Sequence, residues 1–176
     1  MSSDVRIAIS GKSGCGNTTV SRLVAARLGL RVINYTFKDL ARDMGLTFQE
    51  LSDKAEKDPQ YDLSLDKMQV EMAASGRYVL GSRLAIWLLR DTAFTVYLEA
   101  GLETRALRIA KREGLDYATA LRKTERRDTR DRERYLRLYG YDVDDYRFAR
   151  LIISAEPGAE EVAQAIAQAV QDGAKS

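Results

Sequence analysis

Gly11-Lys12-Ser13-Gly14-Cys15-Gly16-Asn17-Thr18-Thr19 is the stretch that decides the fold of this chain of 176 residues. An apolar run at 5–10 precedes it, and a helical pattern at 20–28 follows it. A strand, a glycine-rich turn and a helix N-terminus in this order are typical of a phosphate-binding loop, because free backbone amides and the helix dipole attract anions. The spacing fits G-x-x-x-x-G-K-[ST] everywhere except at Asn17, which stands in the place of the lysine. The sequence therefore predicts a nucleotide phosphate site whose positive charge is incomplete.

Each part of this loop has an expected task at the phosphates. The glycines let the backbone amides approach closely, and Thr18 offers its hydroxyl to a phosphate-bound magnesium ion. Lys12 is a candidate replacement for the missing lysine, since its flexible stem can fold back over the loop. Cys15 is interpreted as a small filler rather than a reactive thiol. The candidate phosphate-binding residues are Gly11, Lys12, Ser13, Gly14, Cys15, Gly16, Asn17, Thr18 and Thr19, and the alternative is a tight turn without a ligand.

Length and composition favour one compact domain. The chain has 45% hydrophobic and 31% charged residues, and its single cysteine excludes an internal disulfide. No apolar run approaches the roughly 20 residues that a membrane helix needs, and no signal peptide is apparent. These features predict a cytoplasmic protein with no membrane partner.

The absence of histidine narrows the chemistry. No side chain has an unperturbed pKa between pH 5 and 8, which argues against a histidine base or a histidine-rich metal site. Phosphoryl transfer to a phosphate acceptor needs neither, because the second pKa of such an acceptor is about 6 and it is largely ionised at neutral pH. The composition permits this reaction.

Strand and helix patterns alternate along the chain, which predicts a parallel sheet covered on both faces. The phosphate loop would then lie at the carboxyl edge of the sheet, where such folds bind ligands. Thr47 and Glu50 form a capping box that starts a helix. Strands are expected at 5–10, 31–35, 78–80, 93–98 and 151–153, and helices at 20–28, 36–44, from 47 onward, 63–74, 103–113, 117–139 and 160–170.

The helix expected at 117–139 concentrates the positive charge. Residues 122–137 hold eight basic and four acidic side chains, in a chain whose net charge is only +2. Arg127, Asp131 and Arg134 share one face, and Arg130 extends this stripe. Residues 122–134 include no apolar side chain, so this part is expected to project from the core. The stripe could clamp phosphates, form a solvated helix or contact nucleic acid, and the last is disfavoured because no broad basic face with aromatics accompanies it.

Several segments of the chain resemble those of a known protein family. The segment 127–134, Arg-Asp-Thr-Arg-Asp-Arg-Glu-Arg, is similar to the R-D-x-R-D-R-x-R lid of bacterial cytidylate kinases. The layout resembles the short archaeal-type cytidylate kinases over nearly the whole chain. The other similar pieces are 7–11, 18–20, Leu80-Gly81-Ser82-Arg83-Leu84-Ala85-Ile86-Trp87, 108–114, Arg134-Tyr135 and Tyr139-Gly140.

The resemblance implies a nucleoside monophosphate kinase in one domain over 1–176. This is a three-layer P-loop NTPase fold with a five-stranded parallel sheet, a helical monophosphate-binding insertion at about 36–76 and a helical lid at about 115–140. It implies transfer of the γ-phosphate of ATP to CMP or dCMP with Mg²⁺. The chain is expected to act as a monomer. By the same resemblance, the acceptor is held by Arg83, Arg127, Asp131 and Arg134. The candidate catalytic residues are Arg127, Arg130 and Arg134 of the lid, together with Lys12, the candidate replacement for the loop lysine.

Two departures from the family pattern keep other functions open. Gly81-Ser82-Arg83 replaces the family's Glu-Gly-Arg, which removes a carboxylate, and Tyr35-Thr36-Phe37 replaces a small-Gly-Asp turn. The first departure motivates a nucleotide-binding regulatory protein without catalysis. The second motivates a kinase with a non-nucleotide acceptor. A cytidylate kinase is the leading hypothesis.

Overall fold

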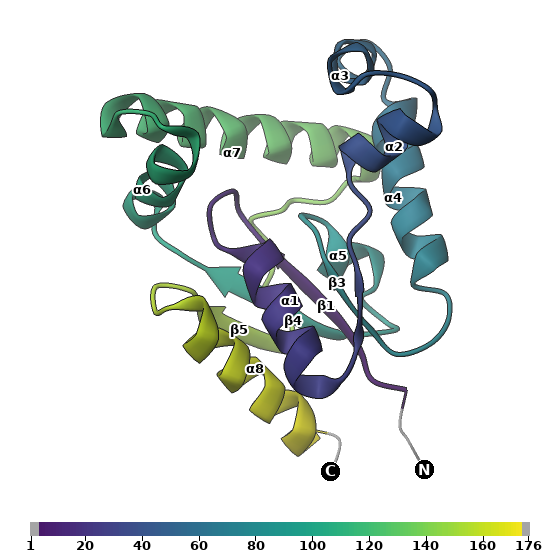
Figure 1. The fold of residues 1–176 in the computed structure, drawn as a ribbon, viewed down its shortest axis with the longest axis vertical. Helices are drawn as coiled ribbons and strands as arrows, with labels where there is room; N and C mark the ends of the chain where they lie inside the picture. The colour runs from purple at the N-terminus through teal and green to yellow at the C-terminus, as the bar shows by residue number, and fades with distance from the viewer. Residues whose placement is uncertain (1–3, 174–176) are drawn as a thin grey trace.

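Five parallel strands form one sheet in the computed structural model, which describes residues 4–173 (Figure 1). In the order of the sheet they are β2 (Arg31–Ile33), β3 (Tyr78–Gly81), β1 (Arg6–Gly11), β4 (Phe94–Glu99) and β5 (Leu151–Ser154). β1 is the central strand and pairs with both β3 and β4. The predicted α/β fold with a five-stranded parallel sheet is confirmed.

Helical segments cover both faces of this sheet and make three layers. α1 (Asn17–Leu28) and α8 (Ala159–Gly173) pack side by side on one face (Figure 1). α5 (Ala85–Leu88) and the chain at 141–149 cover the other. Alternate residues of β1 supply the two cores, since Ile7 and Ile9 face α1 whereas Ala8 faces α5.

Between β2 and β3 the chain leaves the sheet and forms three helices, α2 (Phe37–Asp43), α3 (Phe48–Ala55) and α4 (Gln60–Met72). They occupy the segment predicted as an insertion, and they have an apolar cluster of their own built on Leu40, Ala41 and Leu51. Thr47 and Glu50 form the predicted capping box of α3, and Thr36 and Asp39 form a second one at α2.

The strand predicted at 31–35 ends two residues early, because β2 pairs only with β3 and its last pair is Ile33 with Leu80. The helix predicted at 63–74 begins earlier, at Gln60, directly after Pro59. Proline is well tolerated at the start of a helix, since its missing N–H would have no partner there.

α6 (Leu102–Glu113) and α7 (Tyr117–Tyr139) form a helical hairpin. α7 crosses over the carboxyl end of the sheet and reaches α2 and α4 (Figure 1). Its bounds equal those expected from the sequence. No helix within residues 4–173 is both long enough and apolar enough to cross a membrane.

The expectation that the polar part of α7 projects from the core is wrong on the side that packs against α6. Thr124 is fully buried there, and its hydroxyl donates to the carbonyl of Ala120. Asp128 accepts two hydrogen bonds of 3.0 and 2.7 Å from the guanidinium of Arg105, which is itself buried. Paired charges therefore take the place that apolar side chains hold in most helix contacts.

Candidate functional site

The loop between β1 and α1 has the geometry of an anion cradle. Gly14 and Gly16 adopt positive φ values of 83° and 91°, which side chains rarely tolerate. Gly16 is the N-cap of α1, and no side chain of the described residues caps this end. The first amides of α1 are therefore left for a ligand. A Cβ on Gly11 would lie 2.5 Å from Sγ of Cys15, so the buried cysteine fills space beneath the loop.

The Asn17 side chain does not take the place of a phosphate-binding lysine. Its Nδ2 donates to the carbonyls of Ile9 (3.1 Å) and Ser82 (3.3 Å), and its Oδ1 accepts from the Ser21 hydroxyl (3.0 Å). Asn17 thus joins the end of β1 to the chain after β3. A Cβ on Gly81 would lie 2.7 Å from Oδ1 of Asn17 and 2.2 Å from Oγ of Ser21. The lost carboxylate at position 81 and the asparagine at position 17 are two parts of one packing arrangement.

Lys12 forms an ion pair of 2.7 Å with Asp144, in the chain between α7 and β5. Asp144 also lies 3.3 Å from Nε of Arg132 on α7. The ammonium of Lys12 is therefore held at the edge of the loop by a carboxylate that also contacts the predicted lid. Sequence reasoning did not identify Asp144, because its pairing with Lys12 spans most of the chain.

Two arginines of α6 stabilise the phosphate loop and the chain next to it through hydrogen bonds to backbone carbonyls. The sequence analysis did not identify them as site residues. Arg105 donates to the carbonyl of Ser13 (3.2 Å) while holding Asp128 of α7. Arg108 donates to the carbonyl of Ala155 (2.6 Å), in the chain before α8. α6 therefore links the phosphate loop to both α7 and β5. The only sequence signal was the presence of Arg108 in one of the segments shared with the related family.

Arg83, which follows β3, forms an ion pair with Asp131 of α7. Both side chains, together with Gly11 and Lys12, line a small cavity of about 20 Å³ between the loop and α7. Asp131 also lies 3.6 Å from Arg134. A carboxylate thus sits between two guanidiniums beside the phosphate loop, which is an arrangement suited to an anionic ligand group.

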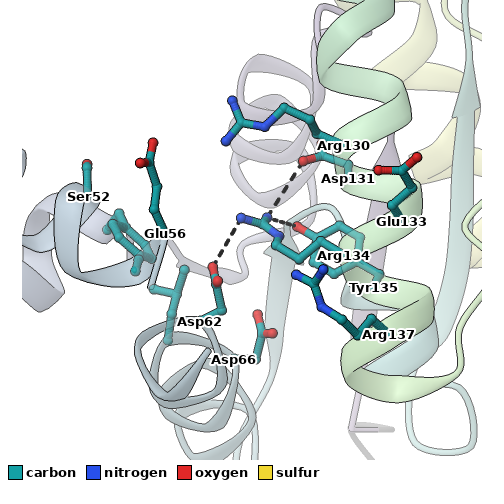
Figure 2. Close-up of a pocket in the computed structure, with 13 residues that line it drawn as sticks. Ser52, Glu56, Asp62, Asp66, Arg130, Asp131, Glu133, Arg134, Tyr135 and Arg137 are labelled. Atoms are coloured by element: carbon teal, nitrogen blue, oxygen red, sulfur yellow. Dashed lines mark hydrogen bonds and ion pairs between the residues drawn. The ribbon is translucent and has the colours of Figure 1, made fainter. Parts of the chain in front are cut away.

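A larger cavity of about 490 Å³ separates the inserted helices from α7 (Figure 2). Arg134 spans it, with its Nη1 3.3 Å from Oδ1 of Asp62 on α4 and its Nη2 2.9 Å from the Tyr135 hydroxyl (Figure 2). Asp131 and Tyr135 line both cavities, so the two are neighbours. The larger one is lined by Phe37, Ser52, Ala55, Glu56, Asp62, Leu65, Asp66, Arg130, Asp131, Glu133, Arg134, Tyr135 and Arg137.

The other two residues of the charged stripe on α7, Arg127 and Arg130, lie in different surroundings. Arg130 lines the larger cavity. Arg127 is turned toward α6, where it lies 3.1 Å from Glu113, so the structure does not bring it together with Arg83 and Arg134. Glu113 also pairs with Arg112 and Lys123. These hydrogen bonds, that of Lys123 first, hold the pKa of Glu113 at about 2.

Two carboxyl groups of α4 differ from the surface acids. Burial raises the pKa of Asp62, although the charge of Arg134 opposes the shift. Burial also raises the pKa of Asp66 to about 6, assisted by the negative charge of Asp62 and opposed by a hydrogen bond from the Tyr139 hydroxyl. Sequence reasoning did not single out these acids, since only the packing of α4 against α7 buries them.

The donor set fits magnesium only as a companion of bound phosphates. Thr18 lies exposed in the first turn of α1, where the motif places a metal-binding hydroxyl. Within residues 4–173 no three His, Cys, Asp or Glu side chains cluster as a metal site. Mg²⁺ commonly binds through phosphate oxygens and waters with one or two protein ligands, so a single hydroxyl is compatible with it.

Comparison with known proteins gives consistent results. A family model described as an AAA domain matches residues 7–135. The chain is similar to "Cytidylate kinase 2" of Borrelia garinii subsp. bavariensis, with 46% identity over 81% of this chain and 82% of that protein. It is also similar to "Cytidylate kinase" of Pyrococcus horikoshii, with 35% identity over 94% of this chain and 88% of that protein.

Solved structures support the fold. A shikimate kinase from Acinetobacter baumannii, in complex with shikimate, superposes with a TM-score of 0.68 at 21% identity, over 97% of this chain and 95% of that one. A shikimate kinase from Bacteroides thetaiotaomicron gives 0.67 at 16% identity, over 95% of this chain and 98% of that one. At such identities the likeness extends to the fold alone.

Proposed function

The chain belongs to the cytidylate kinase family, and from this premise we propose that it transfers the γ-phosphate of ATP to CMP or dCMP. The observation that carries the proposal is the anionic side chain of Asp131 between Arg83 and Arg134, directly beside the phosphate loop. Neither alternative, a non-catalytic regulator or a kinase with a non-nucleotide acceptor, gains support from the related sequences.

The donor phosphates are assigned to the loop. The backbone amides of residues 11–19 and the N-terminal dipole of α1 attract the phosphates of ATP. Thr18 would hold the accompanying Mg²⁺, which neutralises charge on the transferring group. Asn17 acts indirectly, since its hydrogen bonds to Ile9 and Ser82 keep the loop and the end of β3 in register.

The acceptor phosphate is assigned to the arginines next to the loop. In the structure Arg83 and Arg134 each contact Asp131. The acceptor phosphate would replace Asp131 as the partner of both guanidiniums. This position would bring a phosphate oxygen in line with the γ-phosphate of ATP. That oxygen is the nucleophile and is already ionised at neutral pH, so no base is assigned. Arg130 reaches the acceptor cavity directly, whereas Arg127 must leave Glu113 to take part.

We extend the proposal to a monomer acting in cytoplasmic pyrimidine nucleotide metabolism. Every residue assigned to the site comes from one chain, and no nucleic-acid surface is needed for the reaction. Lys12 is proposed to supply the charge missing at position 17, by exchanging Asp144 for the transferring phosphate.

A panel of acceptors tests the function. We expect ADP formation with ATP, Mg²⁺ and CMP or dCMP, a weaker rate with UMP, and loss of turnover when a chelator removes Mg²⁺. A coupled assay of ADP release measures these rates. An absence of turnover with every nucleoside monophosphate, in protein that binds ATP, would contradict the proposal and favour a regulator.

A further inference from the structure

We propose that Asp128 of α7 is a positioning residue for the donor phosphates, because it acts through Arg105 on the backbone of the phosphate loop. This inference rests on the proposed function, in which that loop holds ATP. Three parts of the chain meet at Arg105, namely the loop after β1, α6 itself and the middle of α7 (Figure 1). Asp128 is not among the residues assigned to ATP or to the acceptor.

Every side-chain nitrogen of Arg105 is engaged. Its Nε donates to the Ala100 carbonyl (3.1 Å) and its Nη1 to the Ser13 carbonyl (3.2 Å). Nη1 and Nη2 also donate to the two carboxylate oxygens of Asp128, at 3.0 and 2.7 Å. A guanidinium is planar, so two hydrogen bonds to one carboxylate fix the plane in which its other donors lie. Asp128 therefore sets the direction from which Arg105 meets the loop.

Burial makes this link hard to replace. The Arg105 side chain is only 5% exposed and that of Asp128 18% exposed. A buried donor that loses its partner is not readily satisfied by water, and the loss costs more than a surface ion pair does. The orientation of the guanidinium therefore depends on the carboxylate that α7 supplies.

The Ser13 carbonyl controls the orientation of the next amide in the loop. In a planar trans peptide group the C=O and N–H bonds point to opposite sides, so a carbonyl held by Arg105 turns the N–H of Gly14 away from α6. This amide is one of those assigned to the phosphates of ATP. A Cβ on Gly14 would lie 2.8 Å from the carbonyl oxygen of Arg105, which shows that the loop backbone lies directly against α6.

The charge of Asp128 by itself predicts the opposite effect on ATP. Asp128 lines the small cavity together with Gly11 and Lys12, so its carboxylate lies beside the assigned phosphate site. A negative group there repels ATP, and removing it would strengthen binding if charge alone mattered. The positioning role predicts weaker binding. The sign of the change therefore separates the two effects.

The substitution Asp128→Asn tests the inference, because an amide keeps the shape of the side chain but can accept only through its one oxygen. We expect the Kd for ATP, measured by calorimetry with Mg²⁺ and without acceptor, to rise about 10-fold, the effect of losing one hydrogen bond to a charged group. In steady-state assays the KM for ATP should rise by the same factor, while the KM for CMP stays within twofold.

Thr124→Val is the matched control. Thr124 is fully buried one helical turn before Asp128 on the same face of α7, and its hydroxyl donates to the Ala120 carbonyl of its own helix. This variant disturbs the packing of α7 on α6 without touching the loop, so it should lower Tm but keep the Kd for ATP within twofold.

If Asp128→Asn does not fold, Arg105→Lys replaces it. A lysine keeps the positive charge beside Asp128, but as a point charge it cannot hold the carboxylate and the Ser13 carbonyl in one plane. We expect the same rise in the Kd for ATP.

Failure of the inference is distinguishable from failure of the proposed function. ATP binding by the unaltered protein without turnover of any nucleoside monophosphate contradicts the function, and the calorimetric comparison still decides the role of Asp128. A Kd for ATP that falls, or stays within twofold, in the folded variant overturns the inference and leaves the function standing. An equal rise in Thr124→Val also overturns it, because packing of α7 on α6 would then account for the effect.

Discussion

At the scale of single residues, position 17 shows how one side chain changes the meaning of a motif. The P-loop pattern asks for a lysine there, and the asparagine instead bonds Ile9, Ser82 and Ser21. The consequence reaches Gly81, whose missing side chain leaves room for Asn17 and Ser21. In place of a flexible lysine charge, the loop therefore has an asparagine whose hydrogen bonds link the end of β1 to the chain after β3.

This packing predicts the effect of Gly81→Ala. The added Cβ would displace the hydroxyl of Ser21 and the amide of Asn17, so we expect the free energy of unfolding to fall by about 1–3 kcal/mol. Urea unfolding measures the change, and Gly158→Ala is the control, since its Cβ would meet nothing within 4 Å. Equal free energies of unfolding for the two variants would contradict this prediction, since they would show that Asn17 and Ser21 can move without loss of stability.

Lys12 is the second residue whose role the motif alone does not define. If it replaces the missing lysine, Lys12→Ala should lower kcat about 10²–10³-fold with the fold intact, by analogy with the loss of one transition-state donor. Steady-state kinetics and circular dichroism test both parts. Lys111→Ala on α6, an exposed lysine, is the control. A kcat for Lys12→Ala close to that of the control would leave Lys12 as a surface partner of Asp144 only.

At the scale of elements, α7 is the segment whose interpretation the structure changes most. Its run of charged residues predicts a projecting helix. In the structure, however, side chains from other parts of the fold contact it one after another along its length. α6 supplies Glu113 and Arg105 to its first half, Arg83 meets its middle, and α4 supplies Asp62 and Asp66 to its end. The charged middle of α7 is held by ion pairs, while Tyr135 near its end packs in the apolar core. The ion-paired side chains can exchange partners when an anionic ligand arrives.

The ion pairs at Glu113 give this helix pair a defined pH dependence. The pKa of Glu113 is lowered to about 2 in the folded chain, so its stabilising effect is complete above the unfolded value near 4.5 and is lost as the pH falls toward 2. We expect Glu113→Gln to lower Tm by about 2–4 °C at pH 7 and to leave it nearly unchanged near pH 2.

Thermal unfolding at several pH values measures this difference. Glu125→Gln on α7 is the control, because Glu125 is an exposed carboxylate on the same helix. A Tm difference for Glu113→Gln that stays constant between pH 7 and pH 2 would contradict the proposed source of stability.

At the scale of the whole molecule, the sheet order brings three distant parts of the chain to one edge. β1 lies between β3 and β4, so the loop after β1 and Arg83 after β3 become neighbours. α7 then closes over both from α6. The proposed donor and acceptor sites are adjacent because parallel strands place all their carboxyl ends on the same side.

The sequence by itself determined the five strands, the phosphate loop, the bounds of α7 and the family resemblance. These depend on local signals, namely apolar periodicity, glycine spacing and helix caps, which act over a few residues. The tertiary structure alone decided that Asn17 faces Ser82, that Lys12 meets Asp144, and that Asp62 and Asp66 face α7. Each of these contacts joins residues far apart in the chain, and their partners are selected by packing and by the pairing of buried charge, which no local pattern records.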